Sequence, residues 1–174
     1  DILLKSKIVV CQLKVPKEVT IELINFCHKH NKTLILTPCR PEKLAHEVPS
    51  NKELIEKISI ITCNRKECET IFGTDNIEEC VTMYPNKLIV TLGSEGVMYH
   101  DGENIIKLPS ITVTGIKDTT GAGDTFNGVL AVCIAEGMEL ESAAKYAVAA
   151  SGLSVSRKYV LNSIPYRDEI EEIV

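Results

Sequence analysis

The sequence has 174 residues, of which 44% are hydrophobic, and its formal net charge is −5. This length and composition suit a globular domain with a substantial core and exclude an intrinsically disordered chain. Basic residues are scattered, without a Lys- and Arg-rich run interleaved with aromatics, so the charge pattern indicates neither a nucleic acid nor an anionic membrane as partner. No apolar run approaches the roughly 20 residues of a membrane-spanning helix.

The seven cysteines lie mostly within apolar segments, and their number is odd. This usage is typical of reduced core thiols in a cytoplasmic protein, not of a disulfide framework. Cys63 and Cys68 are close in sequence, but no second pair or His cluster accompanies them, so the pattern does not favour a zinc site. The chain begins without Met, in what reads as the approach to a strand, and we expect it to be a fragment.

Apolar runs alternate with amphipathic stretches along the chain, which predicts an α/β fold. Buried strands are expected at 8–11, 33–36, 58–62 and 87–91. Helices are expected at 16–30, 51–57, 64–72, 77–83, 121–137, 139–155 and from 165 onward. Strands at 97–100 and 105–108 flank the hairpin signal Asp101-Gly102-Glu103-Asn104. We predict a single domain over residues 1–174 with a doubly wound, mostly parallel sheet, helices on both faces in a Rossmann-type three-layer arrangement, and one antiparallel hairpin.

Ligands of open parallel sheets collect beyond the carboxyl ends of the strands. The segments that follow the expected strands are 12–14, 37–40, 64–67 and 91–96. Asn64 and Glu67 present an amide and a carboxylate one helical turn apart, which either caps a helix or holds hydrated Mg²⁺. Thr91, Gly93 and Gly96 belong to a glycine-bearing turn that either reverses the chain or lies along a nucleotide.

The stretch Asp118-Thr119-Thr120-Gly121-Ala122-Gly123-Asp124-Thr125-Phe126 combines a turn of small residues, a helix start and a carboxylate. First-turn N–H groups and the positive end of the helix dipole form an anion site, and Gly-Ala-Gly lets an oxyanion approach the main chain. A carboxylate repels an anion, so Asp124 indicates a specific task, the acceptance of a proton from an attacking hydroxyl. The alternative is that Asp118 or Thr120 caps the helix and Asp124 compensates its dipole.

This nonapeptide resembles the second signature of the ribokinase-like (PfkB) carbohydrate kinases, D-T-x-G-A-G-D-x-F, at every defined position. The resemblance implies that Asp124 is the catalytic base beside the substrate hydroxyl, with an anion hole formed by Gly121, Ala122 and Gly123. The family's N-x-x-E motif coincides with Asn64 and Glu67. By resemblance, this pair organises Mg²⁺ and its waters next to ATP.

The resemblance also implies where ATP and a monovalent cation bind. The family's T-x-G-x-x-G stretch places ATP contacts at Thr91, Gly93 and Gly96, and adenine is expected near Asn127 and the Ala-rich helix. Many members bind a cation such as K⁺ beside the anion hole, and the corresponding positions are Asp118, Thr120, Ser154 and Ser163. Where the family often reads R-K-G-A, this chain has Arg157-Lys158-Tyr159-Val160, so a glycine suited to an unusual backbone angle is missing.

The resemblance runs from Gln12 onward but lacks the family's first third, which carries the sugar-binding Gly-Gly motif and the lid. Lys14 stands where close relatives have a sugar-contacting acid, so its position implies substrate contact without assigning the sugar. We expect ATP-dependent phosphorylation of a pentose, hexose or nucleoside. The alternatives are a fructokinase, phosphofructokinase-like or nucleoside kinase of the same family, or a catalytically silent nucleotide-binding module. The isolated chain is expected to transfer no phosphoryl group, and its open strand edge favours self-association, for example as a homodimer.

Overall fold

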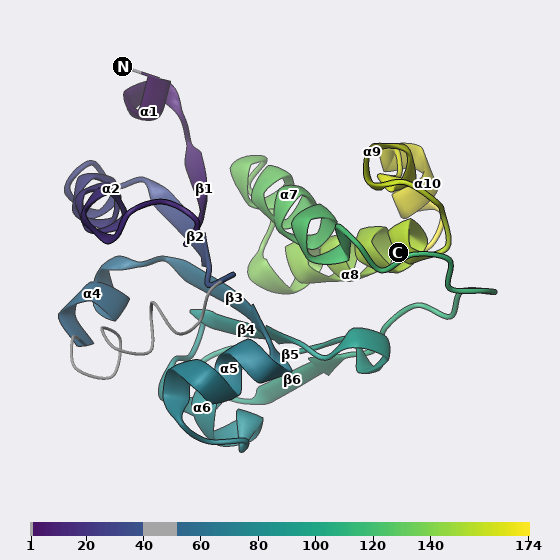
Figure 1. Ribbon diagram of the computed structural model, residues 1–174, viewed down its shortest axis with the longest axis horizontal. Helices are drawn as coiled ribbons and strands as arrows, with labels where there is room; N and C mark the ends of the chain where they lie inside the picture. Colours follow the sequence, from purple (N-terminus) through teal and green to yellow (C-terminus); the bar gives the residue numbers. More distant parts are fainter. Residues whose placement is uncertain (1, 40–51) are drawn as a thin grey trace. The chain divides into compact units, whose positions relative to one another are not determined.

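The computed structural model describes residues 2–39 and 52–174, and its framework is a six-stranded sheet in the order β1-β2-β3-β4-β5-β6 (Figure 1). The strands are β1 Ile8–Gln12, β2 Thr33–Thr37, β3 Ile60–Asn64, β4 Leu88–Thr91, β5 Val97–His100 and β6 Ile105–Leu108. The first four pair in parallel, and β5 and β6 form the antiparallel pair. The predicted α/β class, with a mostly parallel sheet and one hairpin, is confirmed.

The chain packs as two compact units, each with its own helices. The first unit, Asp1–Leu92 with Met98–Ile106, contains α1 Ile2–Lys5, α2 Lys17–Lys29, α4 Lys52–Lys57, α5 Arg65–Phe72 and α6 Ile77–Met83. The second unit, Gly93–Val97 with Lys107–Val174, contains the 3₁₀ turn η1 Gly93–Glu95 and the helices α7 Ala122–Ala135, α8 Leu140–Val155, α9 Val160–Ser163 and α10 Arg167–Glu171.

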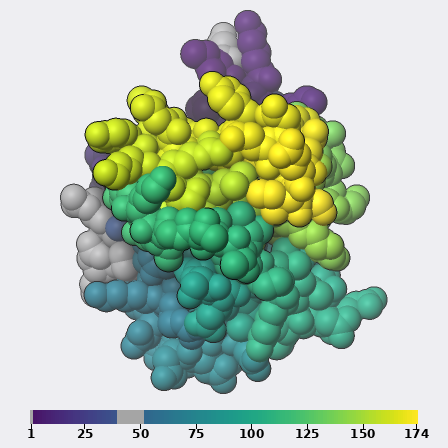
Figure 2. All heavy atoms as spheres, turned by 90° about the vertical axis from the view of Figure 1, so that its right-hand side faces the viewer, coloured from purple at the N-terminus to yellow at the C-terminus, as the bar shows by residue number. Residues whose placement is uncertain are grey.

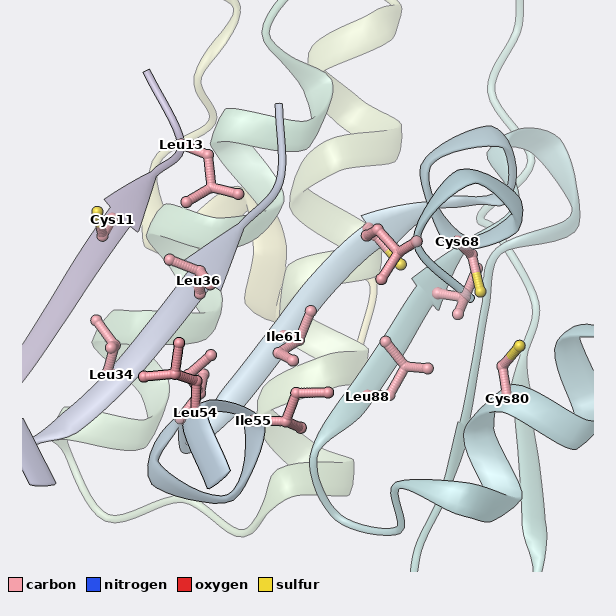
Figure 3. Close-up of a cluster of buried hydrophobic side chains, with 14 of the residues drawn as sticks. Cys11, Leu13, Leu34, Leu36, Leu54, Ile55, Ile61, Cys68, Cys80 and Leu88 are labelled. Carbon is pink, nitrogen blue, oxygen red and sulfur yellow. The ribbon is translucent and has the colours of Figure 1, made fainter. Parts of the chain in front are cut away.

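In the first unit, α2, α4, α5 and α6 cover one face of the parallel strands. Alternate strand residues, such as Leu34 and Leu36 of β2 or Ile61 of β3, join apolar helix residues in one buried cluster (Figure 3). Because the strands follow one another in order and crossovers are right-handed, these helices must lie on the same side. The edge strand β1 is less covered, and Val10 remains 46% exposed.

Lys87 connects the start of β4 to the end of α4. Its Nζ donates to the main-chain oxygens of Ile55, Glu56 and Ile58 at 2.7, 2.9 and 2.5 Å. Burial lowers the pKa of Lys87. The N–H of Ile58 also donates to the oxygen of Ile55, so both the N–H and the oxygen of Ile58 are hydrogen-bonded at the end of α4. These bonds explain why β3 begins at Ile60. The apolar run had predicted that the strand begins at Ile58.

The second unit is built on α7 and α8, which make extensive mutual contact. Small side chains permit the close packing: Ala143, Ala144, Ala147 and Ala150 are fully buried. A Cβ on Gly152 would lie 2.3 Å from Cγ1 of Ile111, so the helix surface must be bare there. The C-terminal segment, yellow in Figure 2, is largely exposed, and α10 also contacts α8.

Short elements account for most differences from the sequence-based expectations. The approach to β1 is the helical turn α1, closed because the N–H and hydroxyl of Ser6 both donate to the oxygen of Ile2. Neither η1 nor α9 was predicted, and α10 begins at Arg167, after an extended Tyr166, and not at Pro165. Parts of two predicted segments, 37–40 and 51–57, lie outside the described residues at Arg40 and Asn51.

All seven cysteines are free, and all except Cys39 are buried, which agrees with core packing. Within residues 2–39 and 52–174, no cluster of three or more His, Cys, Asp or Glu side chains is arranged to hold a metal ion. No helix in the same ranges has the length and apolar character needed to cross a membrane.

Candidate active site

The first turn of α7 is open. Gly121 is the N-cap residue, with φ 81° and ψ −1°, and its oxygen accepts the N–H of Thr125 at 2.8 Å. Oδ1 of Asp118 accepts the N–H of Thr120 at 2.9 Å and does not cap the helix. Because the N-cap residue is a glycine, it makes no side-chain capping bond to α7. The N-cap is Gly121, so the alternative in which Asp118 or Thr120 occupies the cap position is wrong. The N–H of Ala122 donates to the oxygen of Thr119 at 3.3 Å.

Asp124 is exposed in the first turn of α7 and lines a cavity of about 410 Å³. Gly121, Thr125 and Gly128 accompany it on the same side of the helix. The remaining lining is mostly apolar and comes from Val129, Val132, Cys133, Tyr146, Val160, Ile164, Pro165, Arg167 and Ile170. The carboxylate thus faces space large enough for a small organic molecule.

The segment before α7 is fixed to the end of α8. The N–H groups of Lys117 and Asp118 donate to the oxygen of Val155 at 2.8 and 3.3 Å. The hydrogen bonds from Thr120 lower the pKa of Asp118, so its carboxylate stays ionised well below neutral pH. A negative charge therefore lies just before the turn formed by Gly121, Ala122 and Gly123, which is called the anion turn below.

Two serines of the expected cation site, one in α8 and one in α9, are buried. Ser154 is 2% and Ser163 3% exposed, and their hydroxyls donate to the oxygens of Ser151 and Val160 at 2.7 and 2.8 Å. Each hydroxyl oxygen keeps lone pairs for a cation. Tyr159, where the family often has glycine, adopts φ 66° and ψ 134°, so the unusual backbone angle is present although the glycine is not.

The start of α5 carries the expected amide and carboxylate, and they cap each other's backbone. Oδ1 of Asn64 accepts the N–H of Glu67, and Oε2 of Glu67 accepts the N–H of Asn64, both at 2.9 Å. The capping-box interpretation is confirmed. Burial raises the pKa of Glu67. The cap uses Oε2 of the Glu67 carboxylate.

The sheet aligns polar residues at the carboxyl ends of its parallel strands. Asn64 pairs in register with Thr91, and Gln12 pairs with Thr37. Lys14 follows β1 at this edge and is exposed. The first unit therefore brings Asn64 and Thr91 side by side at the carboxyl edge of the sheet.

Three other predicted ATP-binding residues differ in exposure. Gly93 is exposed at φ 63°. Gly96 is buried at φ 92°, and a Cβ there would lie 2.0 Å from the oxygen of Leu108, so close chain packing already requires this glycine. Asn127 is 6% exposed within α7.

Sequence reasoning missed Val160 as a neighbour of the anion turn. A Cβ on Gly121 would lie 2.7 Å from Cγ1 of Val160. No spacing rule links residues on separate helices, and α9 itself was not predicted. The family resemblance places the neighbouring Ser163 near the anion hole but assigns no contact to Val160.

A mostly parallel sheet with polar strand ends and a glycine-rich helix start is typical of α/β proteins that bind phosphate groups. Within that class, the profile of the pfkB family carbohydrate kinases matches residues 1–167, and the chain belongs to this family.

Ribokinases are among the similar proteins. Ribokinase from Bacillus subtilis is 36% identical over 170 residues, which cover 98% of this chain and 56% of that protein. Ribokinase from Lactococcus lactis is 35% identical over 167 residues, covering 96% and 53%. The structure of Arabidopsis thaliana ribokinase complexed with ribose and ATP superimposes with a TM-score of 0.84 at 28% identity, covering 98% and 56%. The chain thus spans little more than half the length of the curated relatives it matches.

Proposed function

We propose that this chain carries the ATP-binding and catalytic portion of a kinase that phosphorylates a sugar hydroxyl. The observation that carries the proposal is the uncapped turn at Gly121, with Asp124 exposed in the first turn of the helix that follows. N–H groups at a helix start favour an anion, and the carboxylate beside them is suited to take up a proton.

In the proposed reaction, the hydroxyl oxygen of the acceptor attacks the γ-phosphorus of ATP while the bond to the β,γ-bridging oxygen breaks. Asp124 accepts the hydroxyl proton, and ADP leaves with the bonding electrons. The N–H groups of Gly121, Ala122 and Gly123 stabilise the charge on the transferring group. Phosphoryl transfer depends mainly on positioning and electrostatics, which a rigid helix start supplies.

The remaining predicted residues are assigned to nucleotide and metal. Asn64 and Glu67 would hold Mg²⁺ through water, since oxygen ligands suit this ion. Bound Mg²⁺ would neutralise phosphate charge. Nucleotide contacts are proposed at Thr91, Gly93, Gly96 and Asn127, and a K⁺ site at Asp118, Thr120, Ser154 and Ser163. Oxygen atoms of these last four residues fit such a cation chemically.

A pentose is the favoured acceptor, because the similar proteins named above are ribokinases. Lys14 follows the carboxyl end of β1, at a position where close relatives have an acidic residue. Its ammonium group favours a substrate that carries an extra hydrogen-bond acceptor or a negative charge. A homodimer is proposed through the uncovered edge strand β1, where Val10 is 46% exposed.

The proposal is tested with a chimera in which this chain follows the amino-terminal portion of Bacillus subtilis ribokinase. Coupled ADP release is measured across pentoses, hexoses and nucleosides, with folding checked by circular dichroism. Sugar-dependent ADP release that disappears in Asp124→Asn supports the proposal. A folded chimera that binds ATP but releases no ADP with any acceptor would identify a silent nucleotide-binding module instead. The 174-residue chain alone is expected to be inactive, because one reactant is not held.

Mg²⁺ organisation is tested in the same chimera. Glu67→Gln should raise the Mg²⁺ concentration needed for the half-maximal rate, since a charged oxygen ligand is lost. An unchanged Mg²⁺ titration would leave Glu67 with its capping role only.

A further inference from the structure

The anion turn is contacted by a residue to which the sequence motifs assign no role. Val160 begins α9, and its Cγ1 lies 2.7 Å from the position that a Cβ on Gly121 would occupy. Gly121 is the residue whose positive φ sets the direction of the turn, and its oxygen accepts the N–H of Thr125. The Val160 side chain therefore rests on the bare Cα at the point where the turn enters α7.

Val160 is placed by an unfavourable backbone conformation at the preceding residue. Tyr159 has φ 66° and ψ 134°, a region that side chains with a Cβ rarely occupy. Such a conformation persists only where its surroundings determine it. Tyr159 does not gain burial in exchange, because it is 72% exposed. Burial of the Tyr159 side chain therefore does not explain the conformation.

Hydrogen bonds fix the chain on both sides of Tyr159. The N–H of Arg157 donates to the oxygen of Ser154 at 3.1 Å, and the Arg157 guanidinium forms a two-point ion pair with Glu169. After Tyr159, the N–H of Ser163 donates to the Tyr159 oxygen at 2.9 Å, and its hydroxyl donates to the Val160 oxygen at 2.8 Å. Residues 157–163 are thus held at their ends, with Tyr159 and Val160 between.

We propose that Val160 is a positioning residue of the anion turn. The backbone at Tyr159 directs the Val160 side chain onto Gly121, which keeps the first-turn N–H groups of α7 in the orientation that an oxyanion requires. This inference rests on the proposed function for its catalytic meaning, but the contact and its effect on the turn are independent of it. A displaced turn would misalign the anion hole without removing any of its donors.

Two pairs of variants in the 174-residue chain test the contact. Val160→Ala removes Cγ1, whereas Leu161→Ala truncates the next side chain of α9, which is 82% exposed. Tyr159→Gly accepts the observed φ, whereas Tyr159→Pro fixes φ near −65° and forbids it. Val160→Ile retains a Cγ1 atom and serves as the conservative variant.

The first readout is hydrogen exchange of the Thr125 amide, which is bonded to the Gly121 oxygen. Val160→Ala and Tyr159→Pro should accelerate this exchange by roughly tenfold. Leu161→Ala, Tyr159→Gly and Val160→Ile should leave it within about twofold of the parent chain. Global stability is measured by urea unfolding, so that local opening is separated from a general loss of structure. Unchanged Thr125 exchange in both Val160→Ala and Tyr159→Pro overturns the inference.

The second readout is affinity for inorganic tripolyphosphate. Val160→Ala should weaken it by roughly tenfold, with Val160→Ile restoring it. Accelerated Thr125 exchange with unchanged tripolyphosphate affinity would overturn the positioning role. If the parent chain binds no tripolyphosphate while Thr125 exchange responds as expected, the proposed function fails and the structural contact stands.

Discussion

The helices α5 and α7 both begin just after a strand or loop that carries polar residues, yet they treat their first turns in opposite ways. At α5, Asn64 and Glu67 cap each other's N–H groups. At α7, Gly121 occupies the N-cap position and makes no side-chain capping bond. One helix start is capped by two side chains, whereas the other has a glycine at its N-cap.

The two helix starts also differ in the pKa shifts of their carboxylates. Burial raises the pKa of Glu67 at the capped start, whereas hydrogen bonds from Thr120 lower the pKa of Asp118 before the open one. A helix start that uses its own side chains gains stability and gives up its donors. An open start keeps its donors for an anion and must derive its geometry from elsewhere, here from the backbone of Gly121 and the contact with Val160.

The largest expected effect concerns Asp124. In the active chimera, Asp124→Asn should lower turnover by about 10²–10⁴-fold with little change in ATP affinity, because the lost interaction is with the attacking hydroxyl. Asp168→Asn is the matched control, since Asp168 is also a first-turn acid, in α10. If the two variants reduce turnover equally and slightly, Asp124 only compensates the helix dipole.

The two glycines of the open turn should respond differently to alanine. Gly121→Ala should lower the free energy of unfolding by about 1–2 kcal/mol or more, because φ is 81° and the new Cβ meets Val160. No atom lies within 4 Å of a Cβ built on Gly123, so Gly123→Ala should stabilise the fold by about 0.4–1 kcal/mol while hindering the anion. Urea unfolding and tripolyphosphate titration measure both effects. A destabilised Gly123→Ala chain would contradict this division of roles.

At the capped start, Asn64→Ala should cost about 1 kcal/mol of stability, the usual loss for an N-cap. Asn76 caps α6 through a similar bond to the N–H of Glu79 at 3.2 Å, so Asn76→Ala is the matched control. Urea unfolding should show similar losses for the two variants. In the chimera, only Asn64→Ala should also raise the Mg²⁺ requirement. An equal Mg²⁺ requirement in both would reduce Asn64 to a cap.

The smallest expected effect is the pH dependence of stability. Folding raises the pKa of Glu67. Its contribution to the free energy of unfolding is therefore fully present below the unfolded pKa of about 4.3 and is lost as pH rises through the folded pKa. Folding lowers the pKa of Asp118, so its contribution is present above about 3.9 and is lost as pH falls through the folded value. Carboxyl ¹³C NMR titrations should show these opposite shifts, and Glu67→Gln and Asp118→Asn should each remove one dependence. Shifts in the same direction would refute the contrast.

Features encoded by neighbouring residues could be predicted from the sequence. The capping box at Asn64 and the hairpin at Asp101 both depend on residues within one turn. The fold class followed from the alternation of apolar runs and amphipathic stretches. These predictions succeeded because local hydrogen bonding and burial decide them.

Contacts between distant segments could not be predicted. The pairing of Asn64 with Thr91 depends on the order of the strands, which periodicity does not report. The positive φ of Tyr159 opposes the intrinsic preference of tyrosine and is imposed by the surrounding hydrogen bonds. Such features arise from tertiary structure, and a single sequence shows only that a glycine expected by resemblance is missing.

Lys87 offers a chemical probe of local opening. Its ammonium has three donors, and three main-chain oxygens at the end of α4 receive them. Amine-reactive reagents require a free, neutral amine, so this lysine should be acylated far more slowly than exposed lysines such as Lys5 or Lys145. Its labelling rate, followed by mass spectrometry, would therefore report how often the α4 end separates from β4 while the rest of the first unit remains folded.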